Sequence, residues 1–297
     1  MAITNKLNLP QPFVDAATSD HRYKEGRYSV TDVLGGTCEA ILKRRHVGEV
    51  TEDVADRVWA IFGTAVHKVL QDAKATDSQL QENWLSADAP VEGYVLSGIF
   101  DLYDDATGTV TDYKTTSVWT AIFGDYEKWR RQCLLYCWLL QGHGFSAWRG
   151  EVVALLRDHN KRKAETEEGY PKHPVIKVEW EFTPSDMEWA EEYLAEWFLE
   201  VQHEETVPDE ALEPCSEEQR WHKPDTWAVV KDGNKRATRV LESQSEAEEL
   251  ADDLWERTGK GHHVEFRRGE DTRCEGYCSV AEFCPYRSSL ENADQKK

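Results

Sequence analysis

Two carboxylates and an amine lie near the middle of the sequence, on either side of a short turn. Asp101 ends an apolar stretch, and Asp112 and Lys114 follow the turn two positions apart. Alternate side chains of a strand share one face, so a hairpin can bring all three together, with the carbonyl of Tyr113 beside them. Such a group can hold a hard cation such as Mg²⁺ and orient a water molecule. An exposed hairpin with a surface ion pair would have the same pattern, so these residues alone decide nothing.

Pairs of residues at helical spacing lie on both sides of this hairpin. Gly63 and His67 precede it, and Gln132 and Tyr136 follow it, each pair four positions apart and hence on one helical face. A single histidine on an apolar helix is more often a core residue than a ligand. The order of these pairs around the hairpin is what favours one shared site.

In this order the residues resemble the RecB-like branch of the PD-(D/E)XK nucleases, which includes CRISPR-associated RecB-like exonucleases and phage recombination exonucleases. The patterns G-x-x-x-H, G-x-x-D, D/E-x-K and Q-x-x-x-Y of that branch all occur in order over residues 63–136. The stretches 97–101 and 111–116 look especially similar to it. Asp112 stands where glutamate is commoner, and this shorter side chain should still reach a metal.

The resemblance implies a role for each matched residue. The implied ligands of Mg²⁺ or Mn²⁺ are His67, Asp101, Asp112 and the backbone carbonyl of Tyr113. Lys114 would position the attacking water and stabilise the negative charge that develops on the phosphate. Gln132 and Tyr136 would orient this group or contact DNA.

Three of the seven cysteines are closely spaced near the end of the chain, at Cys274, Cys278 and Cys284, and Pro285 follows them. Such spacing is typical of iron–sulfur ligation, and zinc is the chemical alternative. The resemblance implies a 4Fe–4S cluster held by these three residues and one distant cysteine. The first two are separated by three residues rather than the usual two.

The fourth cluster ligand has two candidates. Cys38 lies before the G-x-x-x-H helix, where CRISPR-associated relatives carry theirs. Cys215 begins a segment that looks like the C-terminal module of phage-type relatives, and we favour it. Cys133 and Cys137 lie four positions apart on the helix of Gln132, where core packing is the expected role.

The elements that must position these residues follow from periodicity and turn signals. We expect an extended lead-in over 1–28. We expect helices at about 29–42 (weakened by Gly35 and Gly36), 51–73, 125–141, 185–203 (capped by Ser185) and 244–258. We expect strands at 94–103, 109–114, 148–157, 174–182, 226–231, 236–241 and 262–267. The second helix should bury one apolar stripe, made of Val54, Val58, Ile61, Phe62, Ala65, Val66 and Val69.

This order predicts an α/β protein with a restriction-endonuclease-like PD-(D/E)XK core, in which helices flank a mixed central sheet. The core would occupy residues 29–205. A small α+β insertion would follow at 206–268, where prolines and acidic residues mark a change in composition. The cysteine segment and tail would fill 269–297.

Composition limits the setting. The 297 residues carry a net charge of −21, which by itself disfavours a nucleic-acid partner, although short basic clusters are present. The sequence predicts no membrane span and no secretory signal. We therefore expect a cytoplasmic protein of a bacterium or a phage-infected host cell, with reduced cysteines.

We expect a metal-dependent DNA exonuclease of phage or bacterial recombination and repair. Its partners would be DNA, as a single strand or the end of a duplex, and recombination proteins. One alternative is an endonuclease on the same scaffold. Another is a DNA-binding or partner-docking module that an iron–sulfur cluster or zinc stabilises and that has no catalytic activity.

Overall fold

The computed structural model describes residues 2–18 and 23–294, and the chain forms two compact units. The first unit is Met1–Leu212 and the second is Glu213–Lys297. The boundary lies within the proline-containing acidic stretch after residue 205. Residues 213–268 of the predicted module and the terminal cysteine segment therefore lie in one unit, and residues 206–212 belong to the other.

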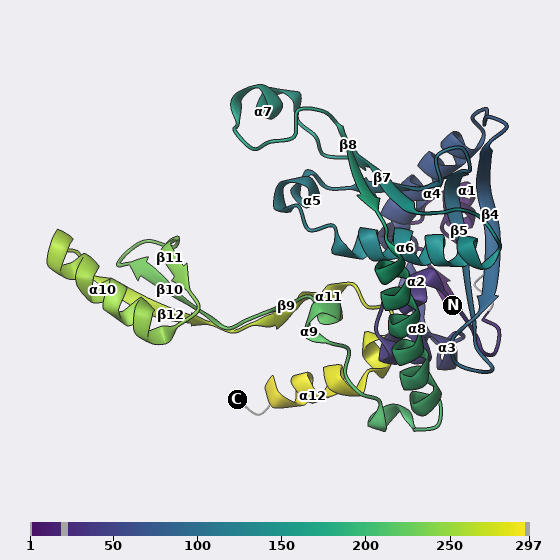
Figure 1. The fold of residues 1–297 in the computed structure, drawn as a ribbon. Helices are drawn as coiled ribbons and strands as arrows, with labels where there is room; N and C mark the ends of the chain where they lie inside the picture. The colour runs from purple at the N-terminus through teal and green to yellow at the C-terminus, as the bar shows by residue number, and fades with distance from the viewer. Residues whose placement is uncertain (1, 19–22, 295–297) are drawn as a thin grey trace. The chain divides into compact units, whose positions relative to one another are not determined.

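A mixed sheet forms the centre of the first unit (Figure 1). Its strands in spatial order are β2 (Arg27–Ser29), β5 (Val95–Asp104), β6 (Thr109–Thr116), β7 (Arg149–Leu156) and β8 (Val175–Glu181), and β4 (Gln79–Asp88) also pairs with β5. The pairs β2–β5 and β6–β7 are parallel, and the other pairs are antiparallel. The predicted mixed central sheet and the predicted hairpin are confirmed.

Strand β5 pairs with three other strands, and two of them share one of its edges. Along one edge it pairs with β4 for its whole length. On the other edge, 95–97 pair with β2 and 102–104 pair with β6. Among the described strands, none pairs with 98–101 on that second edge, because β2 and β6 diverge there. The resulting fork contains Asp101.

The described part of the first unit also contains helices. They are α1 (Gln11–Ala17), α2 (Val30–Val33), α3 (Thr37–Arg45), α4 (Val58–Gln71), α5 (Val118–Phe123), α6 (Glu127–Gly142), α7 (Lys161–Thr166) and α8 (Pro184–Glu204). Helix α6 crosses the sheet and contacts β4, β5, β6 and β7 (Figure 1). It buries leucines at 134, 135, 139 and 140, and α8 packs on it. The hydrophobic core of the unit therefore lies between the sheet and α6.

Several local predictions differ from the structure near the N-terminus. The segment predicted as extended contains β1 (Ala2–Thr4) and helix α1. The helix predicted from residue 51 begins only at Val58, after β3 (Thr51–Asp53) and the 3-10 turn η1 (Val54–Arg57). The carboxylate of Asp53 explains the delay, because it accepts hydrogen bonds from Thr4 Oγ1 and from the backbone of Lys6 and Ala55.

Two other helix ends also differ. The helix predicted over 29–42 is broken at Gly35 and Gly36 into α2 and α3. Helix α8 is capped by Thr183 rather than Ser185, because the Thr183 side chain and the Asp186 carboxylate exchange hydrogen bonds with each other's backbone. Both corrections move a boundary and leave the helices in place.

The apolar stripe predicted on the 51–73 helix is mostly not buried. Val54 is buried, but no residue of α4, all of which is described, is buried. Val58, Phe62 and Val69 are exposed. Periodicity correctly predicts an apolar face there, but it cannot show whether another element covers that face.

The second unit has a small α+β part. Strands β10 (Thr226–Lys231), β11 (Ala237–Leu241) and β12 (His262–Arg267) form a sheet in the order β11-β10-β12, with α10 (Gln244–Thr258) packed on it. Val229, Ala247 and Ala251 form its core. These elements agree with the predicted strands, hairpin and helix.

Short elements make up the rest of the second unit. They are α9 (Glu217–Arg220), β9 (His222–Lys223), β13 (Glu270–Asp271), α11 (Thr272–Gly276), η3 (Ala281–Phe283) and α12 (Pro285–Asp294); in the first unit, η2 (Asp209–Ala211) follows α8. Strands β9 and β13 pair antiparallel. They thus join the segments before and after the small sheet.

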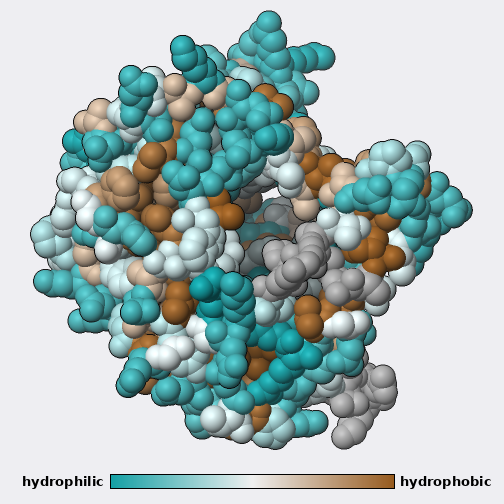
Figure 2. Space-filling model, turned by 90° about the vertical axis from the view of Figure 1, so that its right-hand side faces the viewer, coloured by the Kyte–Doolittle hydropathy of each residue, from teal (hydrophilic) through white to brown (hydrophobic). Residues whose placement is uncertain are grey.

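The face shown in Figure 2 is mostly hydrophilic, and its hydrophobic residues lie in separate small groups. In the described part of the chain, none of the helices combines the length and apolar character needed to cross a bilayer.

Candidate active site and cysteine site

The two predicted carboxylates meet at the fork between β5 and β6. Asp101 is 9% exposed and Asp112 is 3% exposed. The backbone N–H of Tyr113 donates to Asp101 Oδ2 at 2.6 Å, across the point where the two strands part. The Asp101 carboxylate therefore takes the place of the backbone acceptor that a regular ladder would offer to Tyr113. It points at the neighbouring strand.

Lys114 and Gln132 form a closed network with Asp112. Lys114 Nζ lies 2.7 Å from Asp112 Oδ2 and donates to Gln132 Oε1 at 2.9 Å. Gln132 Nε2 donates to Asp112 Oδ1 at 3.0 Å and lies 3.4 Å from the hydroxyl of Tyr136. Burial raises the pKa of Tyr136, so this hydroxyl stays protonated. The amide of Gln132 thus fixes both the carboxylate and the ammonium from α6.

One oxygen of Asp112 remains incompletely satisfied. Within the described residues, Asp112 Oδ2 has no hydrogen-bond donor at a suitable angle, although the Lys114 ammonium is close. Burial raises the pKa of Asp112, and the charge of Lys114 opposes that rise. A buried carboxylate with a spare lone pair is a site that a cation would stabilise.

His67 reaches the same place from α4. Its Nδ1 lies 3.1 Å from Asp101 Oδ1, and its Nε2 lies 2.9 Å from the carbonyl oxygen of Tyr113. Both neighbours are acceptors, so a protonated imidazole satisfies both. The hydrogen bond to Asp101 raises the pKa of His67, and burial opposes the rise. A metal ion could replace one of these protons.

The glycines of the pattern have a steric role. A Cβ on Gly98 would lie 2.7 Å from Tyr136 Cε1 and 3.1 Å from Val30 Cγ2. A Cβ on Gly63 would lie 3.5 Å from Thr115 Oγ1, which is ordinary contact. Only glycine at 98 therefore lets the Tyr136 ring lie against β5.

Glu82 is a site residue that the sequence did not indicate. It lies in β4 between Gln81 and Asn83, which pair with Leu102 and Phe100, so it stands opposite Asp101. Its φ is 50°, which is uncommon for a residue with a side chain. Ligand atoms of His67, Glu82 and Asp101 lie within 4.8 Å of one another. The only available signal was one acidic residue in a segment without clear periodicity.

A cavity of about 590 Å³ lies elsewhere on the sheet. Residues of β4 to β8 line it, and most of its charged groups pair with one another. Lys177 Nζ lies 2.6 Å from Glu151, and Arg149 lies 2.9 Å from Glu181. The catalytic candidates do not line this cavity, so its size says nothing about their chemistry.

Four cysteines gather in the second unit. Burial raises the pKa of Cys274 to about 12, and the nearby thiols of Cys278, Cys215 and Cys284 raise it further, together with Asp271. Cys215 comes from the loop before α9, and the other three come from α11 and the turns around η3. Residues that are far apart in the sequence thus lie near Cys274.

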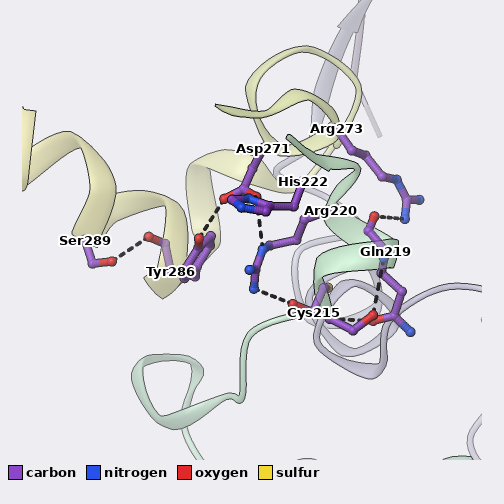
Figure 3. Close-up of polar contacts among 9 residues, drawn as sticks. Cys215, Gln219, Arg220, His222, Asp271, Arg273, Tyr286 and Ser289 are labelled. Atoms are coloured by element: carbon purple, nitrogen blue, oxygen red, sulfur yellow. Dashed lines mark hydrogen bonds and ion pairs between the residues drawn. The ribbon is translucent and has the colours of Figure 1, made fainter. Parts of the chain in front are cut away.

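A buried carboxylate joins the segments that carry these thiols (Figure 3). Asp271, which is 5% exposed, accepts hydrogen bonds from the Tyr286 hydroxyl at 2.6 Å and from Arg220 Nε at 3.3 Å, and His222 Nδ1 lies 2.9 Å away. Arg220 also donates to the carbonyl of Cys215 at 2.6 Å. Asp271 immediately precedes α11 and Tyr286 follows Pro285, so this network connects three of the cysteine segments.

The remaining cysteines lie buried in the first unit. Cys38 lies in α3, and Cys133 and Cys137 lie in α6. Burial raises the pKa of Cys133 and Cys137, as expected for thiols that pack in a core.

Fold and site together define a class of protein. A model of the PD-(D/E)XK nuclease superfamily matches residues 75–285, and the chain belongs to this superfamily. The matched range includes Asp101, Asp112, Lys114, Gln132 and Tyr136.

Individual proteins are similar only at a distance. A crystal structure of SSO0001 is 16% identical, with 63% of this chain and 83% of that chain covered and a TM-score of 0.47. A phage-related exonuclease from Haemophilus somnus 129PT is 11% identical, with 56% and 74% covered and a TM-score of 0.26. None of the curated proteins compared with the chain matches it.

Proposed function

We propose that this chain is a metal-dependent deoxyribonuclease that removes nucleotides from a DNA end. The observation that carries the proposal is the buried carboxylate of Asp112, whose Oδ2 lacks a well-aligned donor beside the Lys114 ammonium. A surface hairpin with an ion pair would expose both partners to water. The proposal follows the chemistry of the superfamily.

The proposed ligands of Mg²⁺ or Mn²⁺ are Asp101, Asp112, the carbonyl of Tyr113, His67 and Glu82. Carboxylate and carbonyl oxygens suit these hard cations, and imidazole suits Mn²⁺ better than Mg²⁺. The cation would supply Lewis-acid stabilisation of the phosphate and lower the pKa of a water molecule. Glu82 is added on geometry alone, because its carboxylate faces His67 Nδ1 at 3.9 Å.

Lys114 would act on the water and the phosphate. Its ammonium is held by Asp112 and by Gln132 Oε1, so its direction is fixed before substrate arrives. A fixed positive charge stabilises the oxygen that becomes negative in the transition state. Gln132 and Tyr136 are then positioning residues, since they orient Asp112 and Lys114 from α6.

The decisive experiment uses end-labelled single- and double-stranded DNA with purified full-length protein and either Mg²⁺, Mn²⁺ or EDTA. We expect cleavage with metal, and none with EDTA or with Asp112→Ala. Cleavage that persists in Asp112→Ala would refute the assigned site. No cleavage by the wild type under any condition would instead favour a non-catalytic DNA-binding or docking module.

Covalently closed circular DNA separates the two kinds of nuclease. An exonuclease needs an end and leaves circles intact, whereas an endonuclease on the same scaffold nicks them. Products released from linear DNA as mononucleotides or short oligonucleotides would support the exonuclease. Nicked circles would move the assignment to the alternative.

We further propose a structural 4Fe–4S cluster at Cys215, Cys274, Cys278 and Cys284. Four neighbouring thiols are a suitable donor set for such a cluster, and zinc is the alternative. The cluster would cross-link the loop before α9 to the C-terminal segment. It would take no part in hydrolysis, which transfers no electron.

Absorbance tests the cluster and its fourth ligand. Anaerobically purified protein should be brown, with sulfur-to-iron absorption near roughly 400 nm. Cys215→Ser should lose this band and Cys38→Ser should keep it. The opposite result would make Cys38 the ligand, and a colourless protein with bound zinc would replace the iron assignment.

The proposed setting is phage or bacterial recombination and repair in the cytoplasm, with recombination proteins as partners. Because the net charge is −21, the protein as a whole does not attract DNA, and only local basic groups should do so. We therefore expect affinity for DNA to depend on few basic contacts and to show a shallow salt dependence.

A further inference from the structure

Helix α4 presents one line of residues towards the catalytic cluster. Trp59, Gly63 and His67 are spaced four apart, so they lie on one face of the helix. His67 contacts Asp101, and Gly63 lies beside Thr115 of β6. Trp59 continues the same face, about 12 Å from His67 along the helix axis at 1.5 Å per residue.

Trp59 is open to solvent and has a cation over its ring. It is 59% exposed, and the guanidinium carbon of Arg157 lies 4.5 Å from its ring centroid. The backbone N–H of Arg157 donates to the carbonyl of Thr116 at 2.9 Å, so this arginine is anchored to the end of β6. Trp59 and Arg157 therefore lie together near the end of β6 that follows the catalytic residues.

Further aromatic side chains are exposed on the elements around this end of β6. Phe62 on α4 lies 6.3 Å from Trp59 in an edge-to-face arrangement. Helix α5 begins soon after Thr116 and exposes Trp119 and Phe123, which stack with their ring centroids 6.0 Å apart. Large exposed aromatic residues beside a cluster of charged groups are typical of a binding surface.

We propose that Trp59 and Arg157 form a stacking site for an unpaired base of the DNA strand whose phosphodiester lies at the catalytic cluster. This inference rests on the proposed nuclease function and adds a substrate preference, for single-stranded DNA or a frayed end. An aromatic ring stacks on the face of a base, which a paired base inside a duplex does not offer. The arginine can stack as well and contact the adjacent phosphate.

A single-stranded occupant fits this surface better than a protein would. His67 belongs to the residues that would hold the scissile phosphate. Along the same face of α4, Trp59 presents an aromatic ring at a distance of a few nucleotides. Thr115 offers a hydroxyl beside Gly63 on this path, and Arg157 offers a positive charge. Normal binding of the single strand by Trp59→Ala would leave this face to a protein partner instead.

The test measures binding in an Asp112→Asn background, which prevents cleavage of the probe. The probe is a fluorescein-labelled single-stranded oligonucleotide, and the same sequence as a blunt duplex serves for comparison. Trp59→Ala should weaken binding of the single strand roughly 10-fold or more, the effect expected for one lost base–aromatic stack. The duplex should change less than the single strand. Arg157→Ala should act in the same direction, and Arg157→Lys should recover only part of the loss.

A second readout separates stacking from a change in fold. A 2-aminopurine placed at successive positions from the end should be quenched at one of them when bound, and Trp59→Ala should remove that quenching. The matched control is Trp255→Ala, because Trp255 on α10 is 58% exposed, nearly the same as Trp59. We expect it to bind and quench as the background protein does.

The outcomes distinguish this inference from the function on which it rests. If the wild type degrades DNA but Trp59→Ala binds the single strand normally, the stacking site is wrong and the nuclease stands. If the wild type never degrades DNA but Trp59→Ala still abolishes quenching, the stacking site stands and the nuclease is wrong. Equal losses for Trp59→Ala and Trp255→Ala, or losses equal for duplex and single strand, would overturn the stacking site.

Discussion

The catalytic cluster and the cysteine site are built in opposite ways. The proposed catalytic side chains project from β5, β6 and α6, which pack on the apolar core, and from α4, none of whose residues is buried. The cysteines lie on short helices, turns and loops, and the buried carboxylate of Asp271 connects their segments. The first site is rigid because the secondary structure of the fold holds its residues, whereas the second is held by polar contacts among its own residues.

This difference predicts how each site responds to loss of its ligand. Removing the cation from the first unit should leave the sheet and α6 unchanged, because they are stable for other reasons. Removing the proposed cluster from the second unit should loosen it, because few buried apolar side chains surround the thiols. A substitution at the first site should therefore affect mainly activity, and one at the second should affect mainly stability.

The largest expected effect is that of Asp112→Asn on activity. Loss of the carboxylate charge should reduce DNA cleavage by a factor on the order of 1,000 or more, since transition-state stabilisation through this group is lost. The midpoint of thermal unfolding should change little, because burial raises the pKa of Asp112 even beside the Lys114 ammonium, so the ionised carboxylate does not stabilise the fold. Glu179→Gln on the exposed side of β8 is the control and should change neither quantity. A large drop in unfolding midpoint for Asp112→Asn would contradict the comparison.

Asp271→Asn should have the largest effect on stability. The variant leaves the partly buried Arg220 without its carboxylate, and breaking such a buried pair costs about 3 kcal/mol. Urea unfolding of the second unit measures this. Glu270→Gln is the matched control, because the neighbouring Glu270–Lys223 pair is exposed to water and should contribute much less. Similar losses for the two variants would show that Asp271 is not the central contact.

The Asp271 carboxylate should also make the stability of the second unit depend on pH in acid. Burial would raise the pKa of Asp271, but hydrogen bonds from Tyr286 and His222 and the charge of Arg220 outweigh this and lower it. Its contribution to stability is therefore complete above about pH 4, the ordinary range of the group, and is lost as the pH falls through the lowered value. Asp271→Asn should remove this part of the acid dependence.

Gly98→Ala should have a smaller effect on stability, in the first unit. Its Cβ would meet the Tyr136 ring at 2.7 Å, and overpacking of this kind costs about 1 to 3 kcal/mol. Activity should fall as well, because a displaced Tyr136 moves Gln132 and hence Lys114. Gly48→Ala is the control, since a Cβ there meets nothing within 4 Å. Thermal unfolding and cleavage rates of both variants test the contact.

The smallest expected effect concerns a peripheral contact of the first unit. His46 lies 2.6 Å from Asp209 and 2.9 Å from Glu49. Burial by itself would lower the pKa of His46, but the hydrogen bonds and charges of these two carboxylates have the larger effect and raise the pKa. The stabilisation is complete below about pH 6.5 and is lost as the pH rises through the raised value. His46→Gln should therefore cost up to about 1 kcal/mol at pH 5.5 and less at pH 8.5. Equal losses at both pH values would rule out a charged His46.

The sequence predicted which of the candidate site residues lie together, because period-two and helical spacing are local properties. Asp112 and Lys114 share a face of β6 as predicted, and Gln132 and Tyr136 share a face of α6. The hairpin that brings Asp101 to them also formed as predicted. The fork itself was not predictable, since it depends on β2, a strand distant in sequence that occupies half of one edge of β5.

Glu82 shows what local patterns cannot predict. No element was predicted over 79–88, because that stretch has neither clear alternation nor β-branched residues. Its place opposite Asp101 comes from pairing between strands, and its positive φ comes from that context too. The exposure of the apolar stripe on α4 could not be predicted for a similar reason, because it depends on whether another element packs over the helix.

The contact between Gly98 and Tyr136 implies that two positions of the family pattern are one steric unit. A larger residue at either position takes space from the other, so acceptable residues there should be selected as pairs. A library randomised at both positions should return combinations of constant summed volume, such as a bigger residue at 98 with a smaller one at 136. Related sequences are then best recognised by scoring these two positions jointly.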